Sequence, residues 1–231
     1  MELSPASQAR TIQDIFTRIA FRYDLMNRLM SIGQDRAWRR TAIRLAALPA
    51  GGRLLDLGCG TGDMAAEATR QYPGGRVLAM DFTPAMMLAG RRRSHAPRDW
   101  SAGDALRLPL PGGIFDAVVS AFLLRNTANV QQALVEQYRV LKRGGRLVVL
   151  DATRPGHSFF TPFLRVYLHQ VIPLLGRIIT GQGDAYAYLP VSMERFLRAE
   201  ELAVRLAAAG FHEVMFRRFN FGSMAIHWGV K

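Results

Sequence analysis

Cysteine is nearly absent from this chain, because Cys59 is the only one among 231 residues. An internal disulfide is therefore excluded, which is typical of proteins in a reducing compartment. Cysteine and histidine together are also too few and too widely spaced to predict a metal site. Cys59 itself lies inside a glycine-rich turn, where we expect a small packing residue and not a nucleophile.

Long uncharged runs are missing as well. No stretch reaches the roughly 18 apolar residues that a membrane-spanning helix needs. The first residues lack the basic-then-apolar layout of a secretion signal. We therefore expect a cytoplasmic protein. Hydrophobic residues still make up 49% of the sequence, which is ample for a core, and the length suits one domain over residues 1–231.

Lysine is also scarce, although the chain carries a net charge of +12. Only Lys142 and Lys231 are lysines, so the basic residues are almost all arginine, as under a genome-wide codon bias. The charge by itself would suit nucleic acid, an anionic membrane surface or an acidic substrate. The arginines are scattered, with residues 91–93 the longest cluster, which favours solvated faces of the protein.

Strand and helix patterns alternate from residue 53 onward. Nearly continuous apolar strands separated by helices predict a mainly parallel sheet that is covered on both faces. Near the end, two short strands joined by a turn predict an antiparallel hairpin. The expected strands are 53–57, 77–80, a short one near Trp100, 117–122, 147–150, 214–219 and 224–230, and the expected helices are 63–71, 84–93, 129–141 and 199–209.

Two segments stand outside this alternation. Residues 1–48 show helical spacing with a break near Tyr23, and we expect them to form an N-terminal helical cover. Residues 154–190 form a strongly apolar insertion, with Phe159, Phe160, Phe163 and Leu164 near its start. This insertion is too short and too charged to span a bilayer. It is either a buried helix pair or a lid over a hydrophobic substrate.

The most informative motif is D-x-G-x-G-x-G, which begins where the apolar strand 53–57 ends. Alternate glycines leave bare backbone against which a ligand can lie, and the spacing differs from the dinucleotide fingerprint G-x-G-x-x-G. An acid on the strand before the turn suits a ligand with an ammonium group. A cofactor with an amino-acid end and a nucleoside end fits, and S-adenosylmethionine is the common one. The predicted cofactor residues here are Asp56, Gly58, Cys59, Gly60, Thr61 and Gly62.

Two later acids complete the predicted cofactor site, because ligands collect at the carboxyl ends of parallel strands. Asp81, followed by Phe82, ends the second strand, where a carboxylate can accept both ribose hydroxyls. Asp104, followed by Ala105, comes after the third strand, where it can reach the exocyclic amine of adenine. A helix N-terminal acid and a simple turn residue are the structural alternatives for the two acids. Their order and spacing with the glycine turn favour the cofactor.

Four blocks of the chain resemble the menaquinone and ubiquinone biosynthesis C-methyltransferases, a family of class I methyltransferases. These blocks are residues 20–39, the glycine turn 54–63, the triplet 124–126 (L-R-N) and residues 138–147, and the spacing of Tyr188-Leu189 and Ser192 is also similar. The first and third blocks discriminate, because many methyltransferases share the glycine turn. The resemblance implies a Rossmann-like α/β fold with a seven-stranded, mostly parallel sheet, helices on both faces and a C-terminal antiparallel hairpin.

The resemblance also implies methylation of a ring carbon on a polyprenylated quinol, with S-adenosylmethionine as the donor. Conversion of demethylmenaquinol to menaquinol is the favoured reaction, and a ubiquinone-precursor benzoquinol is an alternative. Methyl transfer from a sulfonium mainly requires positioning and exclusion of water. The ring carbon becomes nucleophilic when its hydroxyl loses a proton, which calls for a base or for cationic stabilisation.

Most candidate residues for activating the quinol and binding it lie in the two discriminating blocks. We expect Arg125 to stabilise the developing oxyanion and Asn126 to donate a hydrogen bond, although a loop salt bridge is the alternative for this pair. Tyr23 and Asp24 would cover the site and take part in catalysis, or form a capped helix break. The expected substrate contacts are Asn27 and Tyr188, and Asp151 is a further candidate base or a structural strand-end acid.

Two stretches depart from the family pattern. Residues 151–154 (D-A-T-R) replace a glutamate-aromatic-serine-lysine run, and Leu197 stands where proline is typical. Both lie on the substrate side, and they lend support to a C- or O-methyltransferase of another lipophilic aromatic metabolite.

Two further alternatives belong to other classes. A nucleic-acid methyltransferase would suit the positive charge, but the apolar insertion argues against it, and we expect no nucleic-acid partner. A scaffold that only binds the cofactor is disfavoured by the intact turn with Asp81 and Asp104. Charge and apolar cover together predict peripheral contact with an anionic membrane surface, where such a quinol resides.

Overall fold

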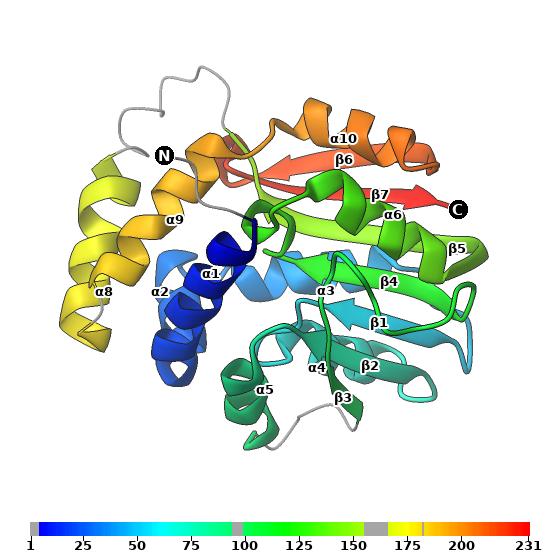
Figure 1. Cartoon of the computed structure of the whole chain (residues 1–231), viewed down its shortest axis with the longest axis horizontal. Coiled ribbons are helices and arrows are strands. Elements are labelled where there is room, and N and C mark those ends of the chain that lie inside the picture. The colour runs from blue at the N-terminus through cyan, green and yellow to red at the C-terminus, as the bar shows by residue number, and fades with distance from the viewer. Residues whose placement is uncertain (1–4, 94–98, 155–165, 182) are drawn as a thin grey trace.

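The computed structural model describes residues 5–93, 99–154, 166–181 and 183–231 (Figure 1). The chain begins with three helices and then alternates between strands and helices, as expected from the sequence. In chain order, the elements up to the middle of the sheet are α1 (Pro5–Ile19), a 3₁₀ turn (Ala20–Arg22), α2 (Tyr23–Met30), α3 (Asp35–Leu45), β1 (Arg53–Leu57), α4 (Asp63–Gln71), β2 (Arg76–Asp81), α5 (Pro84–Arg91), β3 (Asp99–Ala102) and β4 (Phe115–Ala121).

The second half of the chain completes the sheet and adds a helical pair. Its elements are a 3₁₀ turn (Leu124–Asn126), α6 (Val130–Val140), β5 (Leu141–Ala152), a π-helical turn (Tyr167–Val171), α8 (Ile172–Thr180), α9 (Gly183–Arg195), α10 (Ala199–Ala208), β6 (His212–Phe219), a 3₁₀ turn (Asn220–Gly222) and β7 (Met224–Val230).

The described strands form one seven-stranded sheet in the order β3-β2-β1-β4-β5-β7-β6. Strands β1 to β5 pair in parallel, whereas β7 runs antiparallel to both of its neighbours. The strand order reverses between β1 and β4, which is the topological switch point where α/β sheets bind ligands. The mostly parallel sheet and the C-terminal antiparallel hairpin are thus confirmed.

Two hydrophobic cores cover the two faces of this sheet. Successive residues of a strand point to opposite faces, and Leu54 and Leu55 of β1 are both fully buried. Leu54 packs in the core that α3 and α4 form on one face, and Leu55 packs in the core of α6 and α10 on the other. Burial on both faces is the reason that the strands read as nearly continuous apolar runs.

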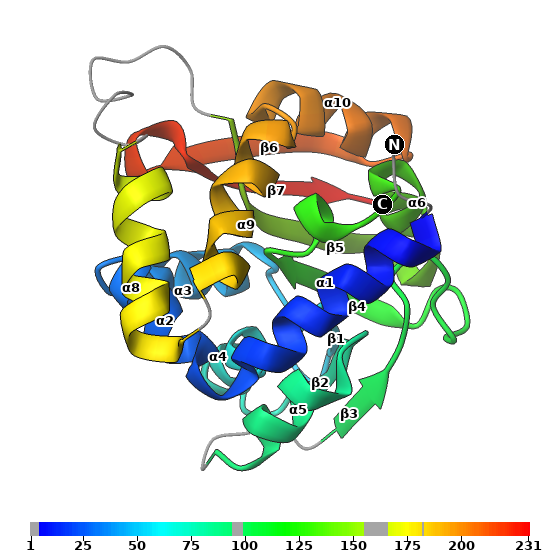
Figure 2. The same ribbon diagram turned by 60° about the vertical axis from the view of Figure 1, so that its left-hand side comes forward.

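A third, smaller core lies at the end of the sheet toward which the parallel strands point. Helices α1 and α2 meet α8 and α9 there (Figure 2). Ile19 and Met26 from the N-terminal helices pack with Ile172 and Tyr186 from the insertion. The helix pair in the insertion is therefore present and buries one side against the N-terminal helices.

Some boundaries differ from the expected ones. The helix expected over 129–141 ends at Val140, because Leu141 already pairs with Phe115 and begins a 12-residue strand, β5. The helix expected over 84–93 ends at Arg91. Phe159, Phe160, Phe163 and Leu164 lie outside the described residues.

Within the described ranges, no helix combines the length and the apolar character that a membrane crossing requires.

Candidate functional site

The glycine turn between β1 and α4 adopts a backbone that only glycine tolerates well. Gly58, Gly60 and Gly62 have φ angles of 69°, 56° and 84°, in the left-handed region. A Cβ atom on Gly58 would also lie 2.8 Å from Cδ1 of Leu123. The amides of Gly58 and Cys59 both donate to the carbonyl of Met80, which ties the turn to β2. The alternating glycines therefore have a local structural cause, and the turn exposes backbone beside β2.

A cavity of about 350 Å³ opens at the carboxyl ends of β1 to β4. Helix α1 closes it from the other side with Ala9, Ile12 and Phe16, and the side chain of Gln13 donates to the carbonyl of Phe82 over 3.0 Å. Gly103 also lines it and has no room for a side chain, because a Cβ there would lie 2.4 Å from Sδ of Met80. Six of the predicted cofactor residues line this cavity: Gly58, Gly60, Asp81, Phe82, Asp104 and Ala105.

Asp81 holds the loops on both sides of the cavity together. One carboxylate oxygen accepts the amide of Gly60 and the other accepts that of Thr83, each over 2.7 Å. Burial raises the pKa of Asp81, while the backbone donors act in the opposite direction. The side chain of Thr83 and the amide of Phe82 also act on this carboxylate, so a ligand hydroxyl in the cavity would share Asp81 with these donors.

Asp104 lies at the opposite rim and is exposed. One of its carboxylate oxygens accepts the amide of Leu106 over 2.9 Å, which is an Asx turn. This hydrogen bond fixes the orientation of the side chain and uses only one of its two carboxylate oxygens. The role of Asp104 in the turn is therefore compatible with a role in binding a ligand.

Asp56 does not line the cavity, contrary to the direct ammonium contact that the sequence suggested. Its side chain is fully buried behind the turn, where Oδ2 accepts the amide of Ala65 over 2.9 Å at the start of α4. Burial raises the pKa of Asp56 to about 7, and the nearby Asp81 adds to the rise. The reason is geometric, because the strand pleat at this position directs the side chain toward α4. Cys59, Thr61 and Gly62 also stay outside the cavity lining.

Thr61 instead anchors α2 to the glycine turn. Its hydroxyl donates to Asp24 over 2.5 Å, and Asp24 forms an ion pair with Arg93 at 3.0 Å. Arg93 also pairs with Asp63 at 2.7 Å, in the first turn of α4. Asp24 does not line the cavity of about 350 Å³, nor the smaller, more apolar cavity that adjoins it. The structure thus gives Asp24 a positioning contact, and Arg93, which the sequence did not single out, is part of it.

A second cavity of about 110 Å³ adjoins the first beneath the N-terminal helices and the insertion. Phe16, Tyr23 and Phe122 line both cavities, so the two spaces meet at these rings. Most of its wall is apolar. Three of the predicted catalytic and substrate residues, besides Tyr23, line it: Asn27, Arg125 and Tyr188. Asn126 lines the first cavity, next to the junction.

Arg125 reaches this cavity as part of a buried ion pair. Its Nη1 atom lies 2.6 Å from Oδ1 of Asp151 at the end of β5, and its guanidinium lies over the ring of Phe122. Nε of Arg125 is buried and has no hydrogen-bond partner among the described residues. The expected salt bridge and the expected positive charge at the site are therefore compatible, because one edge of the guanidinium remains unused.

Tyr23, Tyr186 and Tyr188 line the same cavity as Arg125. Tyr188 donates to Oδ1 of Asn126 over 3.2 Å. Burial raises the pKa of Tyr23, which hydrogen bonding to Asn27 and the charge of Arg125 partly oppose. Tyr186 is almost completely buried, its raised pKa also reflects burial, and within the described chain its hydroxyl has no partner. Sequence reasoning missed Tyr186, because Tyr188 was singled out from the family spacing, whereas Tyr186 is placed by its packing against Met26 and Ile172 from distant parts of the chain.

Comparison with known proteins identifies the group to which this arrangement belongs. The model of the ubiE/COQ5 methyltransferase family matches residues 4–231, nearly the whole chain. The chain belongs to the ubiE/COQ5 methyltransferase family. The resemblance in the four sequence blocks and the prediction of a methyltransferase are confirmed by this membership.

Relatives with assigned names align over nearly their full length. The demethylmenaquinone methyltransferase of Thermus thermophilus is 47% identical over 218 residues, which cover 93% of this chain and 99% of the relative. The ubiquinone/menaquinone biosynthesis C-methyltransferase UbiE of Desulfotalea psychrophila is 43% identical over 226 residues, covering 97% and 92%.

Solved structures agree on the fold of this family member. A methyltransferase from Thermotoga maritima, described as dependent on S-adenosylmethionine and as a possible histamine N-methyltransferase, superposes with a TM-score of 0.69. It is 20% identical, and the match covers 95% of this chain and 99% of that one. A phosphoethanolamine N-methyltransferase of Haemonchus contortus with S-adenosylhomocysteine bound gives 0.61 at 16% identity, over 83% and 52% of the chains. The class I methyltransferase fold is thus confirmed.

Among the described residues, no group of three or more histidine, cysteine, aspartate or glutamate side chains is arranged to hold a metal ion.

Proposed function

We propose that this chain transfers the methyl group of S-adenosylmethionine to a ring carbon of a polyprenylated quinol, converting demethylmenaquinol to menaquinol. The observation that carries the proposal is the pair of adjoining cavities, one flanked by two strand-end acids and one apolar with a polar end, which meet at Tyr23 and Phe122. Relatives that are 47% and 40% identical carry the name demethylmenaquinone methyltransferase.

The larger cavity would hold the cofactor. The carboxylate of Asp81 suits the two ribose hydroxyls, and Asp104 suits the adenine amine. The bare backbone at Gly58 and Gly60 lets the amino-acid end approach the turn without a side chain in between. Asp56 acts from behind, because it holds the turn onto α4. When bound, S-adenosylmethionine supplies an electrophilic methyl group on a sulfonium.

The smaller cavity would hold the quinol ring. Apolar side chains such as Ile15, Ile19 and Met193 form most of its wall, as suits a ring with an isoprenoid tail. Its polar end offers Nε of Arg125 and the hydroxyl of Tyr186, two buried groups without protein partners among the described residues. A buried polar group without a partner costs stability, so ligand oxygens that reach these two groups would satisfy them.

Arg125 would stabilise the oxyanion that develops when the quinol hydroxyl loses its proton. Asp151 holds the guanidinium in place and balances its charge, so we assign it a positioning role. Tyr23 has a raised pKa and stays protonated near neutral pH, so it would donate a hydrogen bond rather than remove the proton. Phe16 of α1 and Tyr23 of α2 line both cavities, and their rings would exclude water from the junction between the two cavities.

A ubiquinone-precursor benzoquinol is the second candidate acceptor. Its ring carries the same pair of oxygens and the same type of tail, and the relative from Desulfotalea psychrophila is named for both pathways. Because either acceptor is lipid-soluble, we also propose that the protein works from the cytoplasm in peripheral contact with an anionic membrane surface.

The direct test is an assay of the purified protein with S-adenosylmethionine and paired naphthoquinol and benzoquinol acceptors that carry short tails. We expect a methylated ring, measured by mass, together with release of S-adenosylhomocysteine. The oxidised quinones are the matched control and should stay unmodified, because they lack the hydroxyl that activates the ring. If neither quinol is methylated while the cofactor binds, the proposed acceptor class is wrong.

A further inference from the structure

Helices α2 and α8 form an antiparallel pair at the surface of the molecule. The hydroxyl of Tyr167, just before α8, donates to the carbonyl of Met30 over 3.0 Å at the end of α2. At the other end of the pair, Nη1 of Arg22 donates to the carbonyl of Ile179. These two contacts place the start of each helix beside the end of the other, as Figures 1 and 2 also show.

Large exposed apolar side chains lie on α2 and α8 and on the residues that flank α2, Phe21 before it and Ile32 after it. Phe21, Ile32 and Ile178 are 75%, 81% and 70% exposed. Within α2, Met26 is fully buried against the third core, whereas Leu25 and Leu29 are 50% and 42% exposed. We call the outer side of this pair, together with the residues just before and after α2, the α2–α8 face; its exposed apolar residues are Phe21, Leu25, Leu29, Ile32, Leu174 and Ile178.

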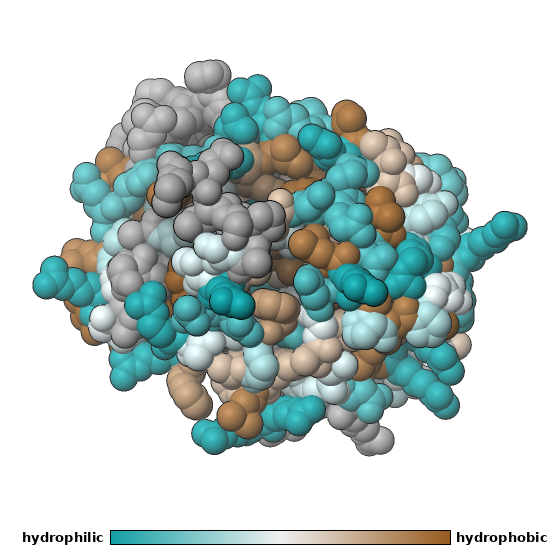
Figure 3. Space-filling view, in the orientation of Figure 1, coloured by the Kyte–Doolittle hydropathy of each residue, from teal (hydrophilic) through white to brown (hydrophobic). Residues whose placement is uncertain are grey.

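The exposed charged residues of α2 and α8 themselves are arginines, while the adjoining helices α1 and α9 also carry the exposed acids Asp14 and Glu194. Arg18, Arg28 and Arg177 are exposed on the same helices or on the adjoining end of α1. Helix α8 has no acidic residue, and the one acid of α2, Asp24, is engaged with Thr61 and Arg93. In Figure 3, hydrophobic residues lie among hydrophilic ones at the edge where Figure 1 shows α8. Exposed apolar residues with flanking arginines suit an anionic lipid surface.

The same helices also form part of the wall of the smaller cavity. Met30 at the end of α2 and Ile172 at the start of α8 both line it. The α2–α8 face and the proposed ring site are therefore the two sides of one thin helical layer. A bilayer docked on this face would lie next to the cavity, which shortens the path of a lipid-soluble acceptor.

We propose that the α2–α8 face is the surface by which this protein docks onto an anionic bilayer. The apolar side chains insert at the level of the headgroups, and the arginines contact lipid phosphates. The inference rests on the proposed function, because a membrane-borne acceptor is what gives the docking a purpose.

The test is flotation of the full chain with vesicles of phosphatidylcholine alone or with added phosphatidylglycerol. The double variant Ile32→Ser/Ile178→Ser should reduce binding to the anionic vesicles at least about tenfold, since it removes two large apolar contacts with the acyl region. The matched control is Val204→Ser/Met215→Ser, at two exposed apolar sites on α10 and β6, which should bind like the unchanged chain.

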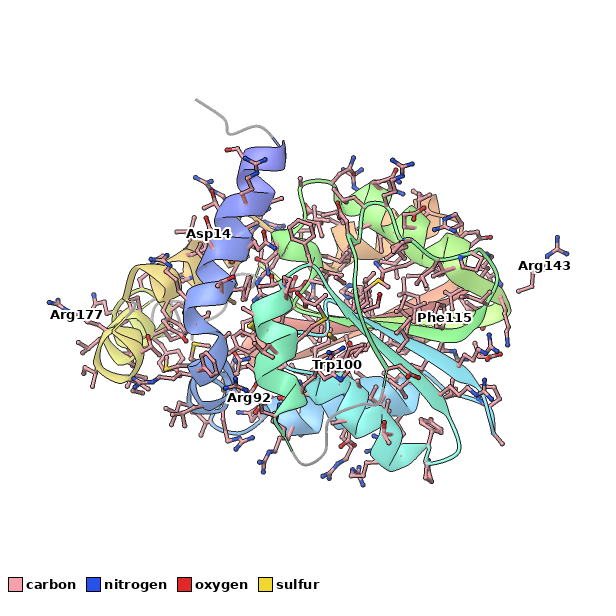
Figure 4. The ribbon with its side chains drawn as sticks, turned by 60° about the horizontal axis from the view of Figure 1, so that its bottom comes forward. Asp14, Arg92, Trp100, Phe115, Arg143 and Arg177 are labelled. Atoms are coloured by element: carbon pink, nitrogen blue, oxygen red, sulfur yellow. The ribbon has the colours of Figure 1, made fainter. Side chains whose placement is uncertain are left out.

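Charge is tested in the same assay. Arg177→Glu should weaken binding and Arg143→Glu should not, because Figure 4 shows these two arginines at opposite ends of the molecule. High salt should release the unchanged chain from anionic vesicles. Equal binding of the Ile32→Ser/Ile178→Ser variant and the unchanged chain, or no binding by the unchanged chain at low salt, would overturn the proposal.

Two further readouts distinguish docking from self-association and from a loss of activity. Sedimentation of the unchanged chain and the double variant should give the same oligomeric state, and a dimer lost only in the variant would assign the face to a second copy and overturn the docking. Turnover of a soluble short-tailed quinol without vesicles should be the same in both proteins. If the unchanged chain fails that turnover, the proposed function fails; if it succeeds and vesicle binding is unaffected by the variants, only the docking surface is wrong.

Discussion

Arg125 and Asp151 form an ion pair that is almost completely buried, with 7% and 1% of the two side chains exposed. Nη1 and Oδ1 lie 2.6 Å apart, although the residues are 26 positions apart in the chain. The amide of Arg125 also donates to the second oxygen of Asp151 over 3.3 Å. The pair joins the loop after β4 to the end of β5, beside the proposed ring site.

Removal of one partner of this pair should destabilise the protein strongly. We expect Asp151→Ala to lower the free energy of unfolding by about 3–5 kcal/mol, because it leaves a buried charge without compensation. Urea denaturation measures the change. The control is Glu200→Ala, which breaks the exposed ion pair with Arg218 and should cost below about 1 kcal/mol. Similar losses in the two variants would contradict the importance of burial here.

Substitution of Arg125 should affect turnover more than cofactor affinity. Arg125→Ala is expected to lower kcat by about 100-fold, the effect of losing one oxyanion-stabilising group, while the Kd of S-adenosylmethionine stays within about threefold. Arg125→Lys keeps the charge and should recover part of the activity, but not the paired geometry with Asp151. Steady-state kinetics and calorimetry measure the two quantities. An unchanged kcat in Arg125→Ala would exclude the proposed role.

Tyr186→Phe should separate stability from turnover. Its hydroxyl is buried without a partner among the described residues, so its loss should leave the free energy of unfolding unchanged or raise it by up to about 1 kcal/mol. We expect kcat/KM for the quinol to fall about tenfold, because a ligand oxygen loses its donor. In contrast, Tyr167→Phe breaks the bond to Met30 and should cost stability by about 1 kcal/mol. A Tyr186→Phe variant with full activity would remove Tyr186 from the ring site.

Asp81 should control cofactor binding. Asp81→Ala removes the acceptors for the amides of Gly60 and Thr83 as well as those proposed for ribose, and we expect the Kd of S-adenosylmethionine to rise at least about 100-fold. Asp104→Ala should give a smaller rise of about tenfold, because Asp104 is exposed at the rim. Isothermal titration calorimetry measures both. Equal effects at the two positions would contradict this order.

The buried carboxyl of Asp56 predicts a pH dependence of stability. Because its pKa is raised to about 7 in the folded protein, the folded state holds a proton between about pH 4 and 7 that the unfolded state releases. The contribution of this group to the free energy of unfolding therefore falls as the pH rises through that window, and levels off above it.

Asp56→Asn should abolish this fall, since an amide does not titrate and can still accept from the amide of Ala65. The difference in unfolding free energy between the variant and the unchanged chain should grow by a few kcal/mol from about pH 5 to about pH 8. Urea titrations at the two pH values give this difference. A difference that does not change with pH would show that Asp56 is ionised in both states.

Much of the fold follows from local sequence patterns. Leu54 and Leu55 are both buried because β1 is covered on both faces, and that burial is directly visible as a continuous apolar run. Gly58 and Gly62 are glycines because the turn needs positive φ angles, a constraint that acts within a few residues. The positions of Asp81 and Asp104 at the cavity follow in turn, since each acid lies at the carboxyl end of a strand near the switch point.

Helix boundaries were less predictable, for a reason that Leu141 illustrates. Its apolar side chain suits the end of a helix equally well, and only the pairing with Phe115 draws it into the sheet. The side-chain direction of Asp56 is a similar case. Its position before the glycine turn was evident, but the strand pleat and the amide of Ala65 at the start of α4 direct its carboxyl away from the cavity.

The sequence by itself thus determined the parallel α/β sheet, the glycine turn and the strand-end acids, because these depend on the backbone and on residues close in the chain. Tertiary structure alone decided the rest. It brought Arg125 to Asp151, placed Tyr186 in the wall of the ring cavity, and set α2 beside α8. These contacts join residues far apart in the chain, and their energies come from burial and pairing in the folded state, to which no local pattern is sensitive.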